Sequence, residues 1–399
     1  MSMPMSSIAK PTAALSDYAV ELARYAREIA ELEPPGADRG RQHRLVYKRY
    51  QQASLRGDYA ALASVDQTLR GLISAERPDP DLCYLKANLD FKFHRLEGVL
   101  RTLQACPDLR DSTPGQALMA DLHLQQGRHD EAERLYREVL AQDPTWDNLA
   151  RLAHLAFKCG EDEVAERYFD DAEDELTVKE MRHYAWLQLQ RGVLDLKRGH
   201  LQAAREHYDR ANRAYTGYWL VAEHRAELLA ALGECDEARA LYETVLAEVP
   251  RPELQQAMGE LCAYMGNDAE AELWFGRALD AYLSSAAQGE VHYLHHLADF
   301  YADVREDGAQ ALHWAGADLA LRQNPATLAA WAWALYRAGR AGEALVPMQR
   351  ALDSREVDAH TLERAAVVFQ AAGSAEAGQR LAQQAHGLNP HARGFHVHR

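Results

Sequence analysis

The sequence predicts an all-α fold, a right-handed α-solenoid of stacked helix–turn–helix repeats. Apolar residues recur three and four positions apart on both sides of Gly127, which predicts two amphipathic helices joined by a short turn within residues 113–148. The same pattern of glycine, small and aromatic residues returns along most of the chain. Each helix has only one apolar face, so neighbouring copies are expected to cover it.

The copies are aligned by a glycine between the two helices of each pair. In the first regular copy, Gly127 is followed by Ala132 and Tyr136. The steps between successive glycines are 33, 39, 34, 33, 73 and 34 residues, and the step of 73 spans two copies, one of which lacks its glycine. The glycines in register are Gly127, Gly160, Gly199, Gly233, Gly266, Gly339 and Gly373.

This period resembles the tetratricopeptide repeat, a helix–turn–helix unit of about 34 residues with small residues where its helices touch and a proline at its exit. The resemblance extends over roughly residues 44–390. It implies that the first helix of each unit lines a concave groove and that the second helix forms the outer wall.

The N-terminal part of the chain is expected to precede the solenoid. Residues 1–15 are polar and predicted to be disordered. A second segment, 16–42, is predicted to contain a helix that Ser16 caps and that ends near Leu32. A Pro-Pro-Gly sequence stops this helix, and residues 37–42 are expected to form a charged linker.

The solenoid is expected to span residues 43–390 and to contain about ten repeats. A segment of small residues at 281–289 is expected to link to the copy that begins near Glu290. The tail, residues 391–399, contains three histidines. Ahead of the regular copies, the expected helices cover residues 43–56, 59–75, 82–93 and 96–105.

The charge balance bears on the class of partner. The chain carries 44 Lys and Arg against 60 Asp and Glu, a formal net charge of −16. Binding to nucleic acid requires clustered cations that neutralise phosphates, so a nucleic-acid partner is not expected. An acidic surface instead favours basic partners.

Cysteine usage and hydropathy bear on the compartment. The five cysteines are scattered and never spaced as Cys-x-x-Cys, which favours buried thiols in a reducing compartment. No apolar run is long enough to span a bilayer, and the N-terminus lacks a secretory apolar core. The sequence therefore predicts a soluble cytoplasmic protein without a membrane partner.

No catalytic motif was found in the sequence. It contains no glycine-rich phosphate loop, no nucleophile elbow and no helix–turn–helix module for DNA. We therefore expect a protein that is not an enzyme and needs no cofactor, a scaffold or adaptor that binds a protein or peptide segment in its groove. Self-association through the first or the last helix stays open.

The aligned copies place one stripe of each first helix in the implied groove. This stripe is acidic and carries an aromatic patch, so the expected partner is basic or of mixed charge. The predicted groove residues are Glu223, Glu227, Glu260, His292, His295, Asp299, Trp333, Tyr336, Arg337, His360 and Glu363.

One segment, residues 290–304, also suggests an alternative function. Placed on a helical wheel, its histidines and aspartates fall within one arc, where imidazoles and a carboxylate one turn apart can hold Zn²⁺ or another divalent transition metal. Such a metal would serve partner binding or catalysis. A solvated or peptide-contacting face and Asp–His pairing for packing remain the other interpretations. The residues of the metal hypothesis are His292, His295, His296, Asp299 and Asp303.

Overall fold

The computed structural model describes residues 15–33, 38–73 and 77–392. These residues form helices and connecting turns, with no strand among them, so the predicted all-α repeat solenoid is confirmed. The predictions of disorder at residues 1–15 and of a histidine-containing tail at residues 391–399 lie almost entirely outside the described residues. Among the described helices, none combines the length and the apolar character needed to cross a bilayer.

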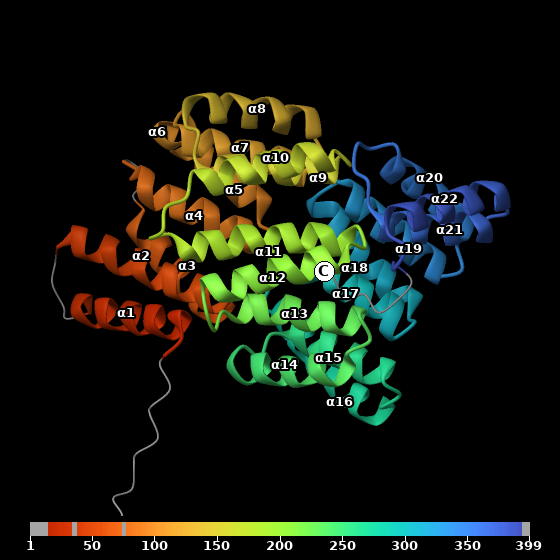
Figure 1. The fold of residues 1–399 in the computed structure, drawn as a ribbon. Helices are drawn as coiled ribbons and strands as arrows, with labels where there is room; N and C mark the ends of the chain where they lie inside the picture. Colours follow the sequence, from red (N-terminus) through yellow and green to blue (C-terminus); the bar gives the residue numbers. More distant parts are fainter. Residues whose placement is uncertain (1–14, 34–37, 74–76, 393–399) are drawn as a thin grey trace, which may run out of the picture.

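Consecutive helices pack against each other as pairs, and each pair packs against the next. In Figure 1 the chain runs from α1 past α7–α10 and α11–α13 to α19–α22. The first half contains α1 (Asp17–Leu32), α2 (Arg39–Arg56), α3 (Tyr59–Leu72), α4 (Pro80–Lys92), α5 (Leu96–Ala105), α6 (Pro107–Arg110), α7 (Thr113–Gln125), α8 (His129–Gln142), α9 (Trp146–Lys158), α10 (Asp162–Asp174), α11 (Met181–Lys197) and α12 (Leu201–Ala214). The second half contains α13 (Trp219–Ala231), α14 (Cys235–Glu248), α15 (Pro252–Tyr264), α16 (Asp268–Ala287), α17 (Leu294–Asp299), the π-helix η1 (Phe300–Val304), α18 (Gly308–Leu321), α19 (Pro325–Arg337), α20 (Ala341–Leu352), α21 (Ala359–Ala371) and α22 (Ala375–Leu388).

The N-terminal helix follows its prediction, but the linker after it does not. Ser16 caps α1, and its hydroxyl oxygen accepts a hydrogen bond of 3.2 Å from the amide of Ala19. Helix α2 begins at Arg39 rather than His43, so most of the segment predicted as a charged linker is helical. Asp38 explains the earlier start, because its carboxylate accepts a hydrogen bond of 3.1 Å from the amide of Gly40.

The turns between paired helices confirm the register of the repeats. All seven register glycines have positive φ, from 72° at Gly127 to 87° at Gly373. Left-handed backbone at this point is the usual end of an α-helix, and glycine adopts it without a clash of its Cβ. The copy that lacks its glycine makes the same turn at Glu306, with φ of 51°.

The prediction that residues 281–289 form a link between helices is wrong, because most of them are helical. Helix α16 continues through most of this segment and ends only at Ala287. Its many alanines and serines allow close packing, and alanine favours the helix over an irregular link. The turn after it, at Gly289 with φ of 81°, brings the chain to the next copy.

The two halves of the solenoid pack against each other along a line of contacts that we call the seam. Each seam contact joins residues far apart in the sequence. The indole nitrogen of Trp219 donates to the carbonyl oxygen of Leu55 at 2.9 Å, and Arg95 donates to Glu290 at 2.7 Å. Further along, the amide nitrogen of the Asn324 side chain donates to a carbonyl oxygen at the end of α7 at 3.0 Å.

The seam continues to the last helix. The backbone amide of Val357 donates to the carbonyl oxygen of Lys158 at 2.7 Å. The Asn389 side chain donates to the carbonyl oxygen of Lys197 at 3.2 Å. The partners at Lys197 and Arg95 are 192 and 195 residues apart, which corresponds to about six repeats of about 34 residues. The solenoid is therefore wound tightly enough for its second half to close over its first.

Candidate functional site

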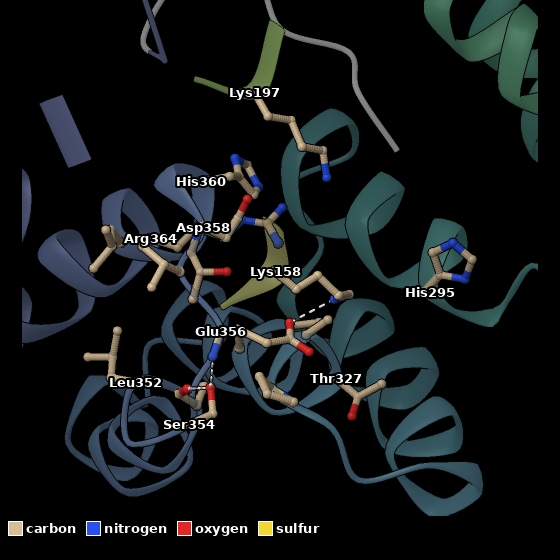
Figure 2. A pocket seen from close by; sticks show the side chains of 18 of the residues that line it. Lys158, Lys197, His295, Thr327, Leu352, Ser354, Glu356, Asp358, His360 and Arg364 are labelled. Carbon is tan, nitrogen blue, oxygen red and sulfur yellow. Dashed lines mark hydrogen bonds and ion pairs between the residues drawn. The ribbon is translucent and has the colours of Figure 1, made fainter. Parts of the chain in front are cut away.

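The closed superhelix surrounds a cavity of about 810 Å³. Its wall from the first half is formed by α9 and α11, which contribute His154, Lys158 and Lys197. Its wall from the second half is formed by α17, α19, α21 and the loop between α20 and α21. Figure 2 shows Lys197 from α11 and His360 from α21 among the side chains around this space. We call it the central cavity.

A second cavity of about 520 Å³ lies beside the first, and His154 lines both. Aromatic side chains form much of its wall, including Trp146 and Trp186, whose ring centroids are 5.9 Å apart in an edge-on arrangement. Lys92, the last residue of α4, also lines it. We call this space the aromatic cavity.

Three acidic residues of the central cavity are tied to cations of the protein. Asp299 lies 2.8 Å from the guanidinium of Arg364. Asp318 lies 3.0 Å from Arg322, one helical turn away. These two carboxylates therefore have little negative charge to offer a ligand.

Glu356 is the third such carboxylate and lies in the loop before α21. Its two oxygens accept from Lys158 at 2.9 Å and pair with the ring of His129 at 2.8 Å. Burial alone would raise the pKa of Glu356, but the hydrogen bond with His129 and the charge of Lys158 outweigh it and lower the pKa to about 2. Glu356 is therefore ionised and anchors the loop to the first half of the solenoid.

Asp358, the fourth acidic residue, caps the N-terminus of α21. Its carboxylate accepts a hydrogen bond of 2.8 Å from the amide of Thr361 and so caps the helix. Burial acts to raise the pKa of Asp358, but the attraction of Lys197 and the capping hydrogen bond lower it to about 2. The carboxylate is thus committed to the helix end.

Two basic groups of the central cavity have no such partner. Among the described residues, the ammonium of Lys197 and the ring of His154 have no ion pair within 4.0 Å. Burial, opposed by Asp358, lowers the pKa of Lys197. Burial and the charges of Lys158 and Lys197 lower the pKa of His154 to about 3. The His154 side chain is accessible, yet protein surrounds it, because its free surface faces the cavity rather than bulk solvent.

The predicted groove residues separate into two sets in the structure. Three of them line the central cavity: His295, Asp299 and His360. The others are not among its lining residues: Glu223, Glu227, Glu260, His292, Trp333, Tyr336, Arg337 and Glu363. The lining carries as many basic as acidic side chains, Lys158, Lys197, Arg322 and Arg364 against Asp299, Asp318, Glu356 and Asp358. The central cavity is therefore not the acidic surface that the glutamates predicted.

The predicted aromatic patch is occupied by contacts within the protein. The indole nitrogen of Trp333 donates to Asp303 at 2.8 Å, and the guanidinium of Arg364 lies 5.4 Å from its ring centroid. Tyr336 lies beside the same indole, with ring centroids 4.9 Å apart. Arg337 donates to Glu306 at 2.7 Å. These residues join α19 to its neighbours.

The prediction of one continuous α-helix over residues 290–304 is wrong. Helix α17 begins only at Leu294, and the chain continues from Phe300 as the π-helix η1. A π-turn contains more residues than an α-turn, so a wheel drawn at the α-helical angle misplaces the side chains beyond it. His292 precedes the helix and does not share its face.

The five residues of the metal hypothesis do not meet. His292 is 5% exposed and stacks on Tyr59 of α3, with ring centroids 4.5 Å apart. Asp299 and Asp303 both bind Arg364, at 2.8 and 2.7 Å. In the part of the chain that the structure describes, no three His, Cys, Asp or Glu side chains are grouped as metal ligands. The arrangement is one of packing and ion pairing.

Sequence reasoning missed the lysines of the two cavities. Lys92, Lys158 and Lys197 are each the last residue of the first helix of a pair. Each stands two positions before the left-handed residue of its turn, His94, Gly160 or Gly199. Alignment of the copies at this position would have found the three lysines together.

A family model described as the TT21 fifth ARM repeats domain matches residues 114–217. The paired helices and their turns confirm the predicted solenoid of helix–turn–helix repeats. No curated protein sequence matches the chain.

Three solved structures show similar helical repeats. The chain is 23% identical to MamA over 42% of its own length and 97% of that protein, with a TM-score of 0.34. It is 15% identical to a chain of the APC/C hetero-tetramer Cut9–Hcn1 over 94% and 81% of the two lengths, with a TM-score of 0.44. A tetratricopeptide repeat protein from Parabacteroides merdae is 17% identical over 69% and 93%, with a TM-score of 0.37.

Proposed function

We propose that this chain of tetratricopeptide-type repeats is a non-catalytic scaffold that binds a segment of a partner protein in its central cavity. The observation that carries the proposal is the cavity itself, about 810 Å³ between the two halves of the solenoid. Binding sites of several hundred Å³ with a few polar groups on a largely formed wall are typical of specific recognition. The wall here combines apolar residues of α19 with the charged residues described above.

The central cavity is partly open to solvent, and the seam beside it contains contacts that a bound segment can replace. It combines packed rings, with His292 stacked on Tyr59 and Trp219 lying against Gly57, with hydrogen bonds and ion pairs such as those of Arg95, Glu356 and Asn389. Such contacts contribute about 1 kcal/mol each, so they can be exchanged for contacts with a partner. Repeat proteins deform in this way because each copy contacts mainly its neighbours.

The proposal is tested by filling the cavity. Ala326 lines the central cavity and is exposed within it, so Ala326→Trp adds volume without disturbing the core. Ala240 of α14 is equally exposed but does not line the cavity, and Ala240→Trp is the matched control. Both variants and the unmodified chain are applied to an array of random peptides, and bound protein is measured at each spot.

We expect the unmodified chain and Ala240→Trp to retain the same peptides and Ala326→Trp to lose them, because the indole occupies their space. Circular dichroism of the three proteins controls for folding. Equal retention by Ala326→Trp would place peptide binding elsewhere on the solenoid and contradict the proposal.

A further inference from the structure

The basic residues of the two cavities are unusual for this chain. The sequence contains only seven lysines among its 44 basic residues, and three of them line the cavities. They come from equivalent positions of α4, α9 and α11. The exterior belongs to a chain of net charge −16, so the cavities place unpaired cations inside an acidic protein.

Two of these lysines lack a counter-ion. Lys158 is bound to Glu356 at 2.9 Å. Among the described residues, Lys92 and Lys197 have no ion pair within 4.0 Å. Burial, reinforced for Lys92 by the charge of Arg251, lowers the pKa of both lysines. Lys197 is half-buried, and an ammonium group partly removed from water without a counter-ion is costly, so an incoming anion relieves that cost. Lys92 is exposed at the wall of the aromatic cavity and is open to an anion from solvent.

Asp358 attracts Lys197 but does not come within ion-pair distance of it, and the other carboxylates nearby are held by other cations. Glu356 is tied to Lys158 and His129, and Asp358 is committed to the end of α21. In the aromatic cavity, Asp147 lies 2.8 Å from Arg151. Asp121 of the same cavity also lies 3.2 Å from Arg151. Among the described residues, Lys92 and Lys197 are therefore the lysines of the two walls that no carboxylate contacts.

We propose that the two cavities together hold an acidic segment of a partner protein, with carboxylates paired to Lys197 in the central cavity and Lys92 in the aromatic cavity. The proposal rests on the proposed function and names the chemistry of the bound segment. It reverses the expectation of a basic partner, which rested on glutamates that do not line the central cavity.

An extended peptide fits this arrangement better than a small anion. The two unpaired lysines lie in separate cavities that meet at His154, so a ligand must be long to reach both. Trp146 and Trp186 offer an apolar surface on the way, which suits a side chain of the same segment. A single phosphate or carboxylate ion could neutralise only one of the lysines.

The test uses three fluorescein-labelled hexapeptides, of glutamate, glutamine and lysine, and fluorescence anisotropy with the full chain at low salt. We expect the glutamate peptide to bind most tightly, although the exterior of the protein repels it. Lys197→Gln should weaken its binding about tenfold or more, because a charge-assisted hydrogen bond is lost. Lys197→Arg, which keeps the charge, should restore most of the affinity.

The control is Lys179→Gln, since Lys179 is exposed in the loop before α11 and lines neither cavity. It should leave the affinity unchanged. Competition by free glutamate or inorganic phosphate at the same low concentration as the peptide would indicate a small-anion site and contradict the peptide proposal. Failure of the glutamate peptide to bind, or equal binding to Lys197→Gln, overturns it.

The outcome separates this inference from the proposed function. If the glutamine or lysine peptide binds best, and Ala326→Trp abolishes that binding, the central cavity is still a peptide site but not one for acidic segments. If peptides bind equally to Ala326→Trp, the scaffold proposal itself fails.

Discussion

The turns between paired helices differ between the two halves of the solenoid. In the first half they face the second half: a methyl group added at Gly57 would lie 2.8 Å from the ring of Trp219, and one at Gly199 would lie 2.5 Å from Asn389. In the second half, a methyl group at Gly233 or Gly339 meets nothing within 4 Å. All four glycines have positive φ. In the second half, the glycine position requires only a left-handed backbone. In the first half, it requires a left-handed backbone and also space for a distant helix that packs against it.

This comparison shows that the repeat and the superhelix make separate demands on one residue. The left-handed turn follows from the local chain, since the helix must end there. The close approach follows from the winding of the solenoid, which brings a distant helix onto the turn. Glycine-to-alanine substitutions at turns with and without a seam contact can therefore measure how much the seam contributes to stability.

The largest effect is expected from Gly57→Ala. A left-handed alanine costs about 1 kcal/mol, and displacement of the buried Trp219 ring adds about 2 kcal/mol. Gly233→Ala carries the first cost alone, so it should lower the free energy of unfolding by about 1 kcal/mol. Urea unfolding followed by circular dichroism compares the two variants. Equal losses would mean that the seam does not constrain Gly57.

A smaller effect is expected from Glu356→Gln, which leaves Lys158 and His129 without their carboxylate at the seam. The variant should lose about 2 kcal/mol at pH 7. Glu343→Gln is the control, because Glu343 pairs with Arg340 on the surface, away from the seam. Surface pairs of this kind contribute little, so we expect no measurable change.

The pH dependence of the unfolding free energy is a second test of the Glu356 ion pairs. The pKa of Glu356 is depressed from 4.5 to about 2, so its contribution is complete above pH 4.5 and is lost as the pH falls toward 2. The difference in unfolding free energy between the chain and Glu356→Gln should therefore be constant from pH 5 to 7 and should shrink below pH 4. A difference that persists at pH 2.5 would contradict the ion pairing of Glu356.

The sequence predicted the features that are decided locally. Ser16 capped the helix predicted for it, α5 has its predicted bounds of 96–105, and the register glycines all occupy left-handed turns. Each of these depends on a few neighbouring residues, whose side chains cap, pack or leave space at one point of the backbone. The turn at Glu306 could not be predicted in this way, because it has a left-handed backbone without the glycine that identifies the other turns.

The features that the sequence could not predict depend on winding. The small rotation between successive pairs accumulates over about five repeats before α2 meets α13, and the period does not set that rotation. The contact of Trp219 with Leu55 and the pairing of Glu356 with His129 are therefore invisible in the repeat pattern. The central cavity depends on the same winding, because residues from both halves line it.

The smallest effect is expected at the edge of the seam, from Arg355→Ala. Arg355 donates to Asp130 and Glu133 of α8, both at 2.8 Å, but its side chain is 38% exposed. Water and salt screen such a pair, so we expect a loss below about 1 kcal/mol that disappears in about 0.5 M NaCl. The neighbouring Glu356, whose side chain is 13% exposed, should keep most of its effect in the same salt. Urea unfolding of Arg355→Ala and Glu356→Gln at low and high salt checks this. If the losses of both variants depend equally on salt, the ion pairs of Glu356 are as exposed to water as those of Arg355, which contradicts the prediction.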